Sequence, residues 1–322
     1  MPLFLSIIIF IVSLVVLIKA ADYFTASSER IGLALGIPQF IIGVTILAIG
    51  TSLPELASSI AAVLQGAPDV VAGNVIGSNI ANVLLVTGFV AIVSRKLIVE
   101  RSLINLDLPL FAMTVGIFIA LTIDRDFTWI DGIFAIIAFV VYAMYSVYAY
   151  RQSAELAEER VEDIQEKTKK GRQKLKARDV IIIIVSIVVV VLGARYLISS
   201  LIDIADAFNI GTSIIALTAV ALGTSLPEIL VSVQAARRKN YDLALGNIFG
   251  SNIFNLTLVM AIPSFFGTLE ISNATLMIGV PMLIVSSVIF VISGISRKIH
   301  NWEGAFMLIL YAVYLGIIFG IL

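Results

Sequence analysis

Two glutamates, Glu55 and Glu228, lie in the middle of long apolar stretches of the sequence. An ionised carboxylate at the centre of a bilayer costs at least about 2.5–3.5 kcal/mol, so such a residue needs a bound ion or another partner. Each glutamate directly follows a proline, which removes one helical hydrogen bond and displaces the carbonyl four residues earlier. The displaced carbonyls belong to Gly50 and Gly223. We therefore predict two interrupted helices, each with a carboxylate beside the interruption.

The residues around each glutamate offer oxygen ligands. Helical spacing places Ala48, Thr51 and Glu55 on one face, with Ser52 beside them. Oxygen ligands with two carboxylates suit calcium or sodium, whereas zinc or copper would draw on histidine or cysteine. Hydroxyls can instead bond within or between helices, but their repetition beside both glutamates favours the ligand interpretation. The candidate ion-binding residues are Glu55, Glu228, Thr51, Thr224, Ser52, Ser225, Ser78, Ser251, Asn82, Asn255, Ala48 and Ala221.

Small and amide residues accompany the candidate ligands. The glycine pairs have the small-xxx-small spacing that is typical of close helix packing, and we assign them to packing. The neighbouring asparagines are expected to cap or brace the interruptions. The glycines are Gly73, Gly77, Gly246 and Gly250, and the asparagines are Asn74, Asn79, Asn247 and Asn252.

The composition shows what kind of molecule must position these residues. Of 322 residues, 60% are hydrophobic and only 43 are charged, which excludes a two-domain soluble enzyme. The net charge of −1 argues against a nucleic-acid partner, and the absence of cysteine excludes disulfides and thiolate metal sites. The apolar N-terminal stretch lacks a basic region before it, so we interpret it as a retained first helix. Ten transmembrane helices are predicted, at about 3–24, 38–64, 70–93, 103–123, 129–150, 179–200, 211–236, 243–266, 274–296 and 302–321.

The sequence contains an internal repeat. A shift of 173 residues aligns Ile41–Val86 with Ile214–Val259 without a gap, with 22 identities in 46 positions. Each repeat contains five predicted helices, and an odd number of crossings gives the two halves opposite orientations in the membrane. The predicted fold is therefore an all-α polytopic membrane protein with ten transmembrane helices in two inverted five-helix repeats. Its predicted parts are a first repeat at 1–150 with ion motif 43–88, a charged loop at 151–178, and a second repeat at 179–322 with ion motif 216–261.

The basic residues predict the orientation. If the charged loop is cytoplasmic, 18 of the 21 basic residues lie in cytoplasmic connections, and Arg125 alone lies in an outer connection. We therefore predict a multi-pass protein of the cell membrane with both termini outside. The loop itself favours a solvated helix over a regulatory calcium-binding domain, because it is short and has no EF-hand pattern.

Both repeats resemble the alpha-repeats of the calcium/cation antiporter superfamily. The motif Gly-Thr-Ser-Leu-Pro-Glu, at 50–55 and 223–228, looks like that of the sodium/calcium exchanger branch in its short prokaryotic form. The resemblance covers all ten predicted helices. It implies ion sites at the midplane between helices 2, 3, 7 and 8, with helices 1 and 6 sliding across that core. It also implies calcium held by Glu55, Glu228, Thr51 and Thr224, and flanking sodium sites formed with the Ala48 and Ala221 carbonyls and with Ser52, Ser78, Ser225 and Ser251.

The resemblance implies a secondary active antiporter that exchanges calcium for sodium by alternating access. Such a protein is not an enzyme, has no cofactor, and has calcium, sodium and the lipid bilayer as partners; we expect it to function as a monomer. Close relatives can carry an aspartate where this chain has Asn82 or Asn255. Both residues are asparagine here, so a third carboxylate is missing and the central site has at most two negative charges.

Four other functions are alternatives to calcium/sodium exchange. Proton coupling is disfavoured because the proton-coupled branch of the superfamily typically shows a Gly-Asn pair before its glutamate, which this chain lacks at that place. The motif does not exclude potassium coupling. A channel normally needs a symmetric oligomer or an open ring, whereas the symmetry here is internal and antiparallel. An intramembrane hydrolase would need a base partner for its serine, and the sequence offers no plausible one.

Three charged residues fall outside the ion motifs. Asp22 and Arg195 occupy equivalent places in helices 1 and 6, and we expect both to reach toward the membrane interface. Asp107 is expected near the cytoplasmic end of helix 4.

Overall fold

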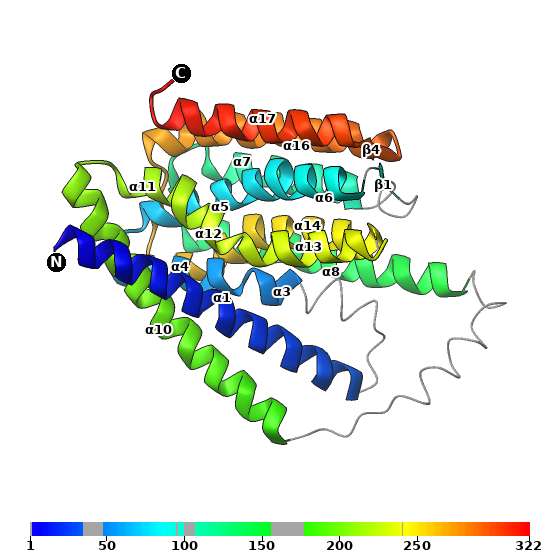
Figure 1. Cartoon of the computed structure of the whole chain (residues 1–322), viewed down its shortest axis with the longest axis horizontal. Helices are drawn as coiled ribbons and strands as arrows, with labels where there is room; N and C mark the ends of the chain where they lie inside the picture. Colours follow the sequence, from blue (N-terminus) through cyan, green and yellow to red (C-terminus); the bar gives the residue numbers. More distant parts are fainter. Residues whose placement is uncertain (1, 35–47, 95, 100–106, 156–176, 240) are drawn as a thin grey trace.

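The computed structural model describes residues 2–34, 48–94, 96–99, 107–155, 177–239 and 241–322, and the described chain is almost entirely helical (Figure 1). Eight of its helices are long and apolar enough to cross a membrane, and two shorter apolar helices, α4 and α7, accompany them. A helix therefore occupies each of the ten predicted crossings.

The first half contains α1 (Leu3–Ala34), α3 (Ala48–Thr51), α4 (Leu53–Leu64), α5 (Asp69–Ile80), η2 (Ala81–Val86), α6 (Thr87–Ser94), α7 (Leu108–Thr122) and α8 (Trp129–Glu155). The second half contains α10 (Ala177–Phe208), α11 (Thr212–Ile215), η4 (Ala216–Val220), α12 (Ala221–Thr224), α13 (Leu226–Arg237), α14 (Tyr241–Phe254), η5 (Asn255–Val259), α15 (Met260–Ser264), η6 (Thr275–Gly279), α16 (Val280–Ile295) and α17 (Asn301–Ile318).

The predicted boundaries were wrong mainly for α1 and α10. Each has 32 residues, so each continues well past the predicted ends at 24 and 200. A helix of this length spans about 48 Å, more than the hydrocarbon core requires. The two helices contact each other along their length and run obliquely to the rest of the molecule (Figure 1). Residues 38–47 and 103–106 of the predicted crossings, and most of the charged loop, lie outside the described residues.

The two predicted interruptions are present. The second crossing breaks at Ser52, between α3 and α4, and the seventh breaks at Ser225, between α12 and α13. Each break immediately precedes a Leu-Pro-Glu sequence, so Pro54 and Pro227 stand in the first turn of the following helix, where proline is tolerated. The glutamates therefore lie in the first turns of α4 and α13.

Two short strand pairs join the helix connections and were not predicted. β1 (Lys96–Ile98) pairs with β4 (Lys298–His300), and β2 (Asp126–Phe127) pairs with β3 (Leu269–Glu270), both antiparallel. The repeat shift of 173 residues superimposes β1 on β3 and β2 on β4. Because the single crossing α7 separates β1 from β2, the two pairs lie at opposite ends of the molecule. Equivalent strands at opposite ends are the mark of inverted halves, which confirms the predicted fold class.

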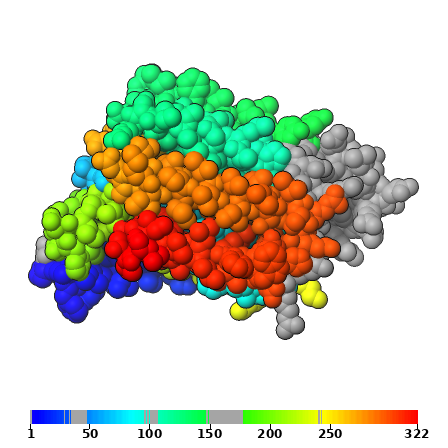
Figure 2. Space-filling model, turned by 90° about the horizontal axis from the view of Figure 1, so that it is seen from above, coloured from blue at the N-terminus to red at the C-terminus, as the bar shows by residue number. Residues whose placement is uncertain are grey.

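The outer helices expose apolar side chains. The face seen in Figure 2 is formed by α16 and α17, with α7 and α8 beside them. Large apolar residues of these helices, including Phe134, Val288 and Phe306, are exposed. Figure 1 shows both termini at the same end of the molecule, as an even number of crossings requires.

Two side-chain contacts fasten α1 to α10, one near each end. The Arg30 Nε donates to Asp179 Oδ1 at 2.7 Å, and the Ser6 hydroxyl donates to Asp203 Oδ2 at 3.2 Å. The repeat shift places Ser6 on Asp179 and Arg30 on Asp203, so the contacts are symmetry-related although only one is an ion pair. We infer that α1 and α10 are held as one unit.

Removing one partner of the ion pair should destabilise the protein measurably. Asp179 is buried, so Asp179→Asn leaves Arg30 without its compensating charge. We expect the apparent melting temperature of the purified protein to fall by roughly 2–8 °C, the shift that a loss of about 1–2 kcal/mol produces in a protein of this size. Arg30→Gln should give a similar loss, and the double variant should add little to either single variant.

The control is Asp22→Asn. Asp22 pairs with Lys19 at 3.7 Å, and both side chains are exposed, so its loss should leave the melting temperature almost unchanged. Additive losses in the Arg30 and Asp179 double variant would show that the two residues act independently.

Candidate ion-binding site

The two glutamates are fully buried at the centre of the helix bundle. Glu55 lies in the first turn of α4 and Glu228 in the first turn of α13. A helix N-terminus carries partial positive charge, which favours a carboxylate at this position. Ser52, which directly precedes the first turn that contains Glu55, donates a hydrogen bond to Glu228, so the two carboxylates are neighbours. Within the described residues, no group of three His, Cys, Asp or Glu side chains could hold a metal, so the described site has two carboxylates and neutral oxygens.

Hydroxyl groups from both repeats reach each carboxylate. Ser52 donates to Glu228 Oε1 at 3.2 Å, and Ser78 lies 3.5 Å from Glu55 Oε1. Thr224 also lies beside Glu55, and Thr51 and Ser251 lie beside Glu228. Ser52 and Glu228 belong to different repeats, so the two motifs form one continuous site.

Several buried oxygens of this site have no hydrogen-bond partner among the described residues. They include one oxygen of each carboxylate, Glu55 Oε2 and Glu228 Oε2, together with Ser225 Oγ. A buried polar atom without a partner is costly, and native structures contain few of them. Their concentration around two carboxylates is what a site for a dehydrated cation requires.

Asn82 and Asn255 lie where helices 3 and 8 change to π-helical geometry. η5 begins at Asn255, and Asn82 is the second residue of η2. Both amide side chains are buried, and neither the nitrogen nor the oxygen has a partner in the described structure. π-helical turns occur frequently at functional sites. η2 packs against α13 and η5 packs against α4, the helices that carry Glu228 and Glu55.

Two of the candidate ligand types are partly engaged within their own helices. The Thr224 hydroxyl donates to Val220 O at 3.0 Å, which is the back-bonding alternative considered above. The Ala48 and Ala221 carbonyls accept the Ser52 and Ser225 N–H groups at 3.2 and 3.1 Å. A carbonyl oxygen has two lone pairs, so each can still serve a cation.

Thr51 is held differently from its counterpart Thr224. Its hydroxyl lies 3.3 Å from Ser251 Oγ and 3.4 Å from Asn247 Oδ1, both on α14. The structure therefore brings most of the candidate side chains together around the glutamates, while their roles as ligands stay predictions. Those it connects are Thr51, Thr224, Ser52, Ser78 and Ser251.

A second layer of polar residues supports the glutamates, and part of it was not predicted. Asn74 Nδ2 lies 3.5 Å from Glu55 O and 3.3 Å from Ser58 Oγ, and Asn247 Nδ2 donates to Ser232 Oγ at 3.1 Å. Asn74 and Asn247 therefore brace the helices at the interruptions, as expected. Asn79 instead donates to Val75 O of its own helix at 2.8 Å, and neither amide atom of Asn252 has a partner among the described residues. The supporting serines were missed, although Ser59, which Asn74 also contacts, and Ser232 are identical at equivalent positions of the repeats.

Close packing around the site depends on glycine. A Cβ atom at Gly73 would lie 2.9 Å from Ser213 O, and one at Gly77 would lie 2.6 Å from the Ala221 Cβ. A Cβ at Gly50 would collide with Thr25 of α1, and one at Gly223 would collide with Leu14 of the same helix. The packing role predicted for the Gly73 and Gly77 pair is confirmed, and α1 lies directly over both interruptions.

The remaining charged candidates lie away from this centre. Asp22 pairs with Lys19, and Asp107 is half-buried immediately before α7. Arg195 lines a groove on the outer surface between α4 and α10.

Inverted halves with interrupted helices and charged residues at their common centre define the architecture of a secondary transporter in the membrane. The family model described as sodium/calcium exchanger protein matches residues 5–148 and 179–320. The chain therefore belongs to the sodium/calcium exchanger family, which confirms the resemblance seen in the sequence.

Individual relatives agree over almost the whole chain. The sodium/calcium exchanger MaX1 of Methanosarcina acetivorans is 32% identical over 97% of this chain and 98% of its own length. The uncharacterized membrane protein MJ0091 of Methanocaldococcus jannaschii is 34% identical over 94% of this chain and 95% of its own. A solved structure of the sodium-calcium exchanger NCX_Mj, soaked with sodium and strontium, shares 30% identity and a TM-score of 0.66 over 98% of this chain and 99% of that one.

Proposed function

We propose that this protein is a secondary active antiporter that exchanges calcium for sodium across the membrane by alternating access. The observation that carries the proposal is the convergence of Glu55 and Glu228, fully buried and from opposite repeats, each with one oxygen free of protein hydrogen bonds. Two carboxylates neutralise one divalent cation, and the surrounding hydroxyl and carbonyl oxygens complete a coordination shell that suits a hard ion.

The site residues divide between the two ions in this proposal. Calcium lies between the two glutamates and contacts Thr51 and Thr224. Sodium ions occupy flanking positions that share the same carboxylates, and the two amides complete the central plane. The proposed sodium ligands are Ser52, Ser78, Ser225, Ser251 and the Ala48 and Ala221 carbonyls, and the amides are those of Asn82 and Asn255.

Shared ligands couple the two ions. A carboxylate that neutralises calcium cannot at the same time fully neutralise sodium ions beside it, so each ion type displaces the other. Residues 1–150 and 179–322 act as the two repeats, with ion motifs 43–88 and 216–261, and the α1–α10 unit slides across them to open either side. We further propose that the protein works as a monomer in the cell membrane, with both termini outside and loop 151–178 in the cytoplasm.

The test is ion-gradient-driven uptake in vesicles that contain the purified protein. Vesicles loaded with sodium should accumulate calcium when diluted into sodium-free buffer, and a sodium ionophore should abolish the uptake. Uptake driven equally well by a proton gradient would assign the protein to the proton-coupled exchangers, and a requirement for potassium would assign it to the potassium-dependent ones. Calcium flux that needs no counter-ion and does not saturate would identify a channel and overturn the proposal.

A further inference from the structure

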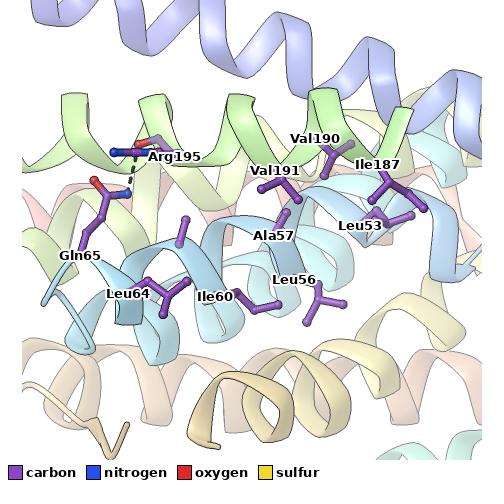
Figure 3. Close-up of a pocket in the computed structure, with 11 residues that line it drawn as sticks. Leu53, Leu56, Ala57, Ile60, Leu64, Gln65, Ile187, Val190, Val191 and Arg195 are labelled. Carbon is purple, nitrogen blue, oxygen red and sulfur yellow. Dashed lines mark hydrogen bonds between the residues drawn. The ribbon is translucent and has the colours of Figure 1, made fainter. Parts of the chain in front are cut away.

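A groove on the surface of the bundle runs between α4 and α10 (Figure 3). Its volume is about 470 Å³, and its walls are formed by aliphatic side chains of both helices. On α10, the adjacent residues Ile184, Val188 and Leu192 are exposed. The groove therefore opens sideways from the bundle, where a membrane-spanning helix faces hydrocarbon. Its aliphatic lining includes Leu53, Ile60 and Leu64 of α4 and Ile187, Val190 and Val191 of α10.

Polar groups line only one end of this groove. Figure 3 shows Gln65 and Arg195 together at that end, where the Gln65 Nε2 donates to the Arg195 carbonyl at 3.1 Å. This hydrogen bond fixes α4 against α10 beside the guanidinium. Arg195 is exposed, and no ion pair within the described part of the chain joins it to an acidic residue. Its repeat equivalent, Asp22, instead pairs with Lys19 at 3.7 Å.

The dimensions match one leaflet of a bilayer. From Leu53 to Gln65 α4 rises about 18 Å, and from Ile187 to Arg195 α10 rises about 12 Å. Half of a hydrocarbon core is about 15 Å thick. The groove therefore extends along the helices for about the thickness of one leaflet. Arg195 lies at the end of the groove where α4 leads into the connection before α5.

We infer that the α4–α10 groove binds an anionic phospholipid. One acyl chain lies along the aliphatic walls, and the phosphate group accepts hydrogen bonds from the Arg195 guanidinium, whose planar fork matches phosphate oxygens. The lipid supplies the negative charge that this arginine lacks among the described residues, and basic pockets between membrane helices recognise lipid headgroups in this way. A lipid is favoured over a protein helix because a narrow apolar groove with one cation at headgroup depth complements a single acyl chain and its phosphate.

The site connects to transport through its two walls. One wall is the helix that carries Glu55, and the other is a helix that slides in the proposed function. A bound lipid therefore touches both the ion-binding core and the element that moves past it. This consequence rests on the proposed function, whereas lipid binding itself does not.

Native mass spectrometry of the purified full-length protein tests the inference. The protein is equilibrated with vesicles of phosphatidylcholine that contain phosphatidylglycerol, extracted, and analysed for retained lipid. The wild type should retain phosphatidylglycerol, and Arg195→Gln should retain about tenfold less, the change expected for the loss of one charge-assisted hydrogen bond. Ala57→Phe, which fills the apolar part of the groove, should also lower retention although it changes no charge.

The matched control is Arg125→Gln. Arg125 is an exposed cation of an outer connection that donates to Asn273 at 2.9 Å and lies outside the groove, so its variant should retain lipid as the wild type does. Equal retention by wild type and Arg195→Gln would overturn the inference, and so would an equal loss in Arg125→Gln. Because retention is measured without ion flux, a failure here is distinct from a failure of the antiport proposal.

Discussion

Glu55→Gln is expected to abolish calcium uptake driven by a sodium gradient, and Glu228→Gln should do the same. Glutamine keeps the shape of the side chain but removes half of the negative charge that offsets dehydration of a divalent cation. Loss of one partner from a buried charged pair typically costs about 3–5 kcal/mol, so uptake at low calcium should fall by about a hundredfold or more. The measurement is the initial rate of calcium uptake into sodium-loaded vesicles, normalised to the amount of reconstituted protein.

The controls separate loss of charge from loss of folding. Glu55→Asp keeps the charge and should retain more activity than Glu55→Gln, while Asp22→Asn removes an exposed carboxylate that pairs with Lys19 and should transport normally. Thr51→Ala removes one neutral contact and should weaken uptake by about tenfold, consistent with the smaller contribution of an uncharged hydrogen bond. Wild-type uptake by either glutamine variant would show that its glutamate is not an ion ligand.

The chemistry of the site could be predicted because it depends on residues whose cost in a membrane is large. Glu55 and Glu228 are expensive in any apolar helix, and their repetition with the same neighbours leaves few functions for them. Pro54 and Pro227 predicted the interruptions because a missing N–H disturbs the helix locally. The helices break beside these prolines, at Ser52 and Ser225. Such features depend on single residues and their nearest neighbours, so no knowledge of tertiary contacts was needed.

Features that depend on contacts between distant segments could not be predicted. The π-helical turns at Asn82 and Asn255 have no signature in hydropathy, because the residues are as apolar on average as those of an ordinary helix. The strand pair of β1 with β4 joins connections about 200 residues apart in the sequence. The sequence does not predict the full length of α1, because charged residues near its end, such as Arg30, indicate the end of an apolar helix. In the structure Arg30 lies within α1 and is compensated by Asp179.

The difference between the two halves is also a tertiary property. Leu14 of α1 packs on Gly223, but its repeat equivalent, Ile187 of α10, lines the α4–α10 groove. Gly50 is covered instead by Thr25 of α1. Two repeats with similar sequences thus place their first helices differently against the core. This inequality is what alternating access requires, because exchanging the two arrangements would exchange the side of the membrane that is open.

Asn255→Asp is expected to add a proton-dependent step to calcium binding. The Asn255 side chain is buried at the start of η5, with both amide atoms unpartnered in the described structure. Because η5 packs against α4, the helix that carries Glu55, we expect an added carboxylate to act on the same ions as the glutamates. It would introduce a third ionisable group. As the pH rises and this group ionises, calcium affinity in the variant should increase more steeply than in the wild type, by about tenfold or more given the strength of charge interactions at short range in a protein interior.

The measurement is calcium affinity as a function of pH, with sodium affinity determined in parallel. Asn82→Asp, at the equivalent position of the other repeat, should change the profile in the same direction. Asn273→Asp adds the same charge in the connection before η6, where Asn273 is exposed and accepts from Arg125, and should leave the profile unchanged. If Asn255→Asp and the wild type gave identical pH profiles and ion affinities, Asn255 would lie outside the ion-binding shell. Its two unpartnered amide atoms would then need another explanation, because the proposed ligand role is what accounts for a fully buried amide without a partner at the start of η5.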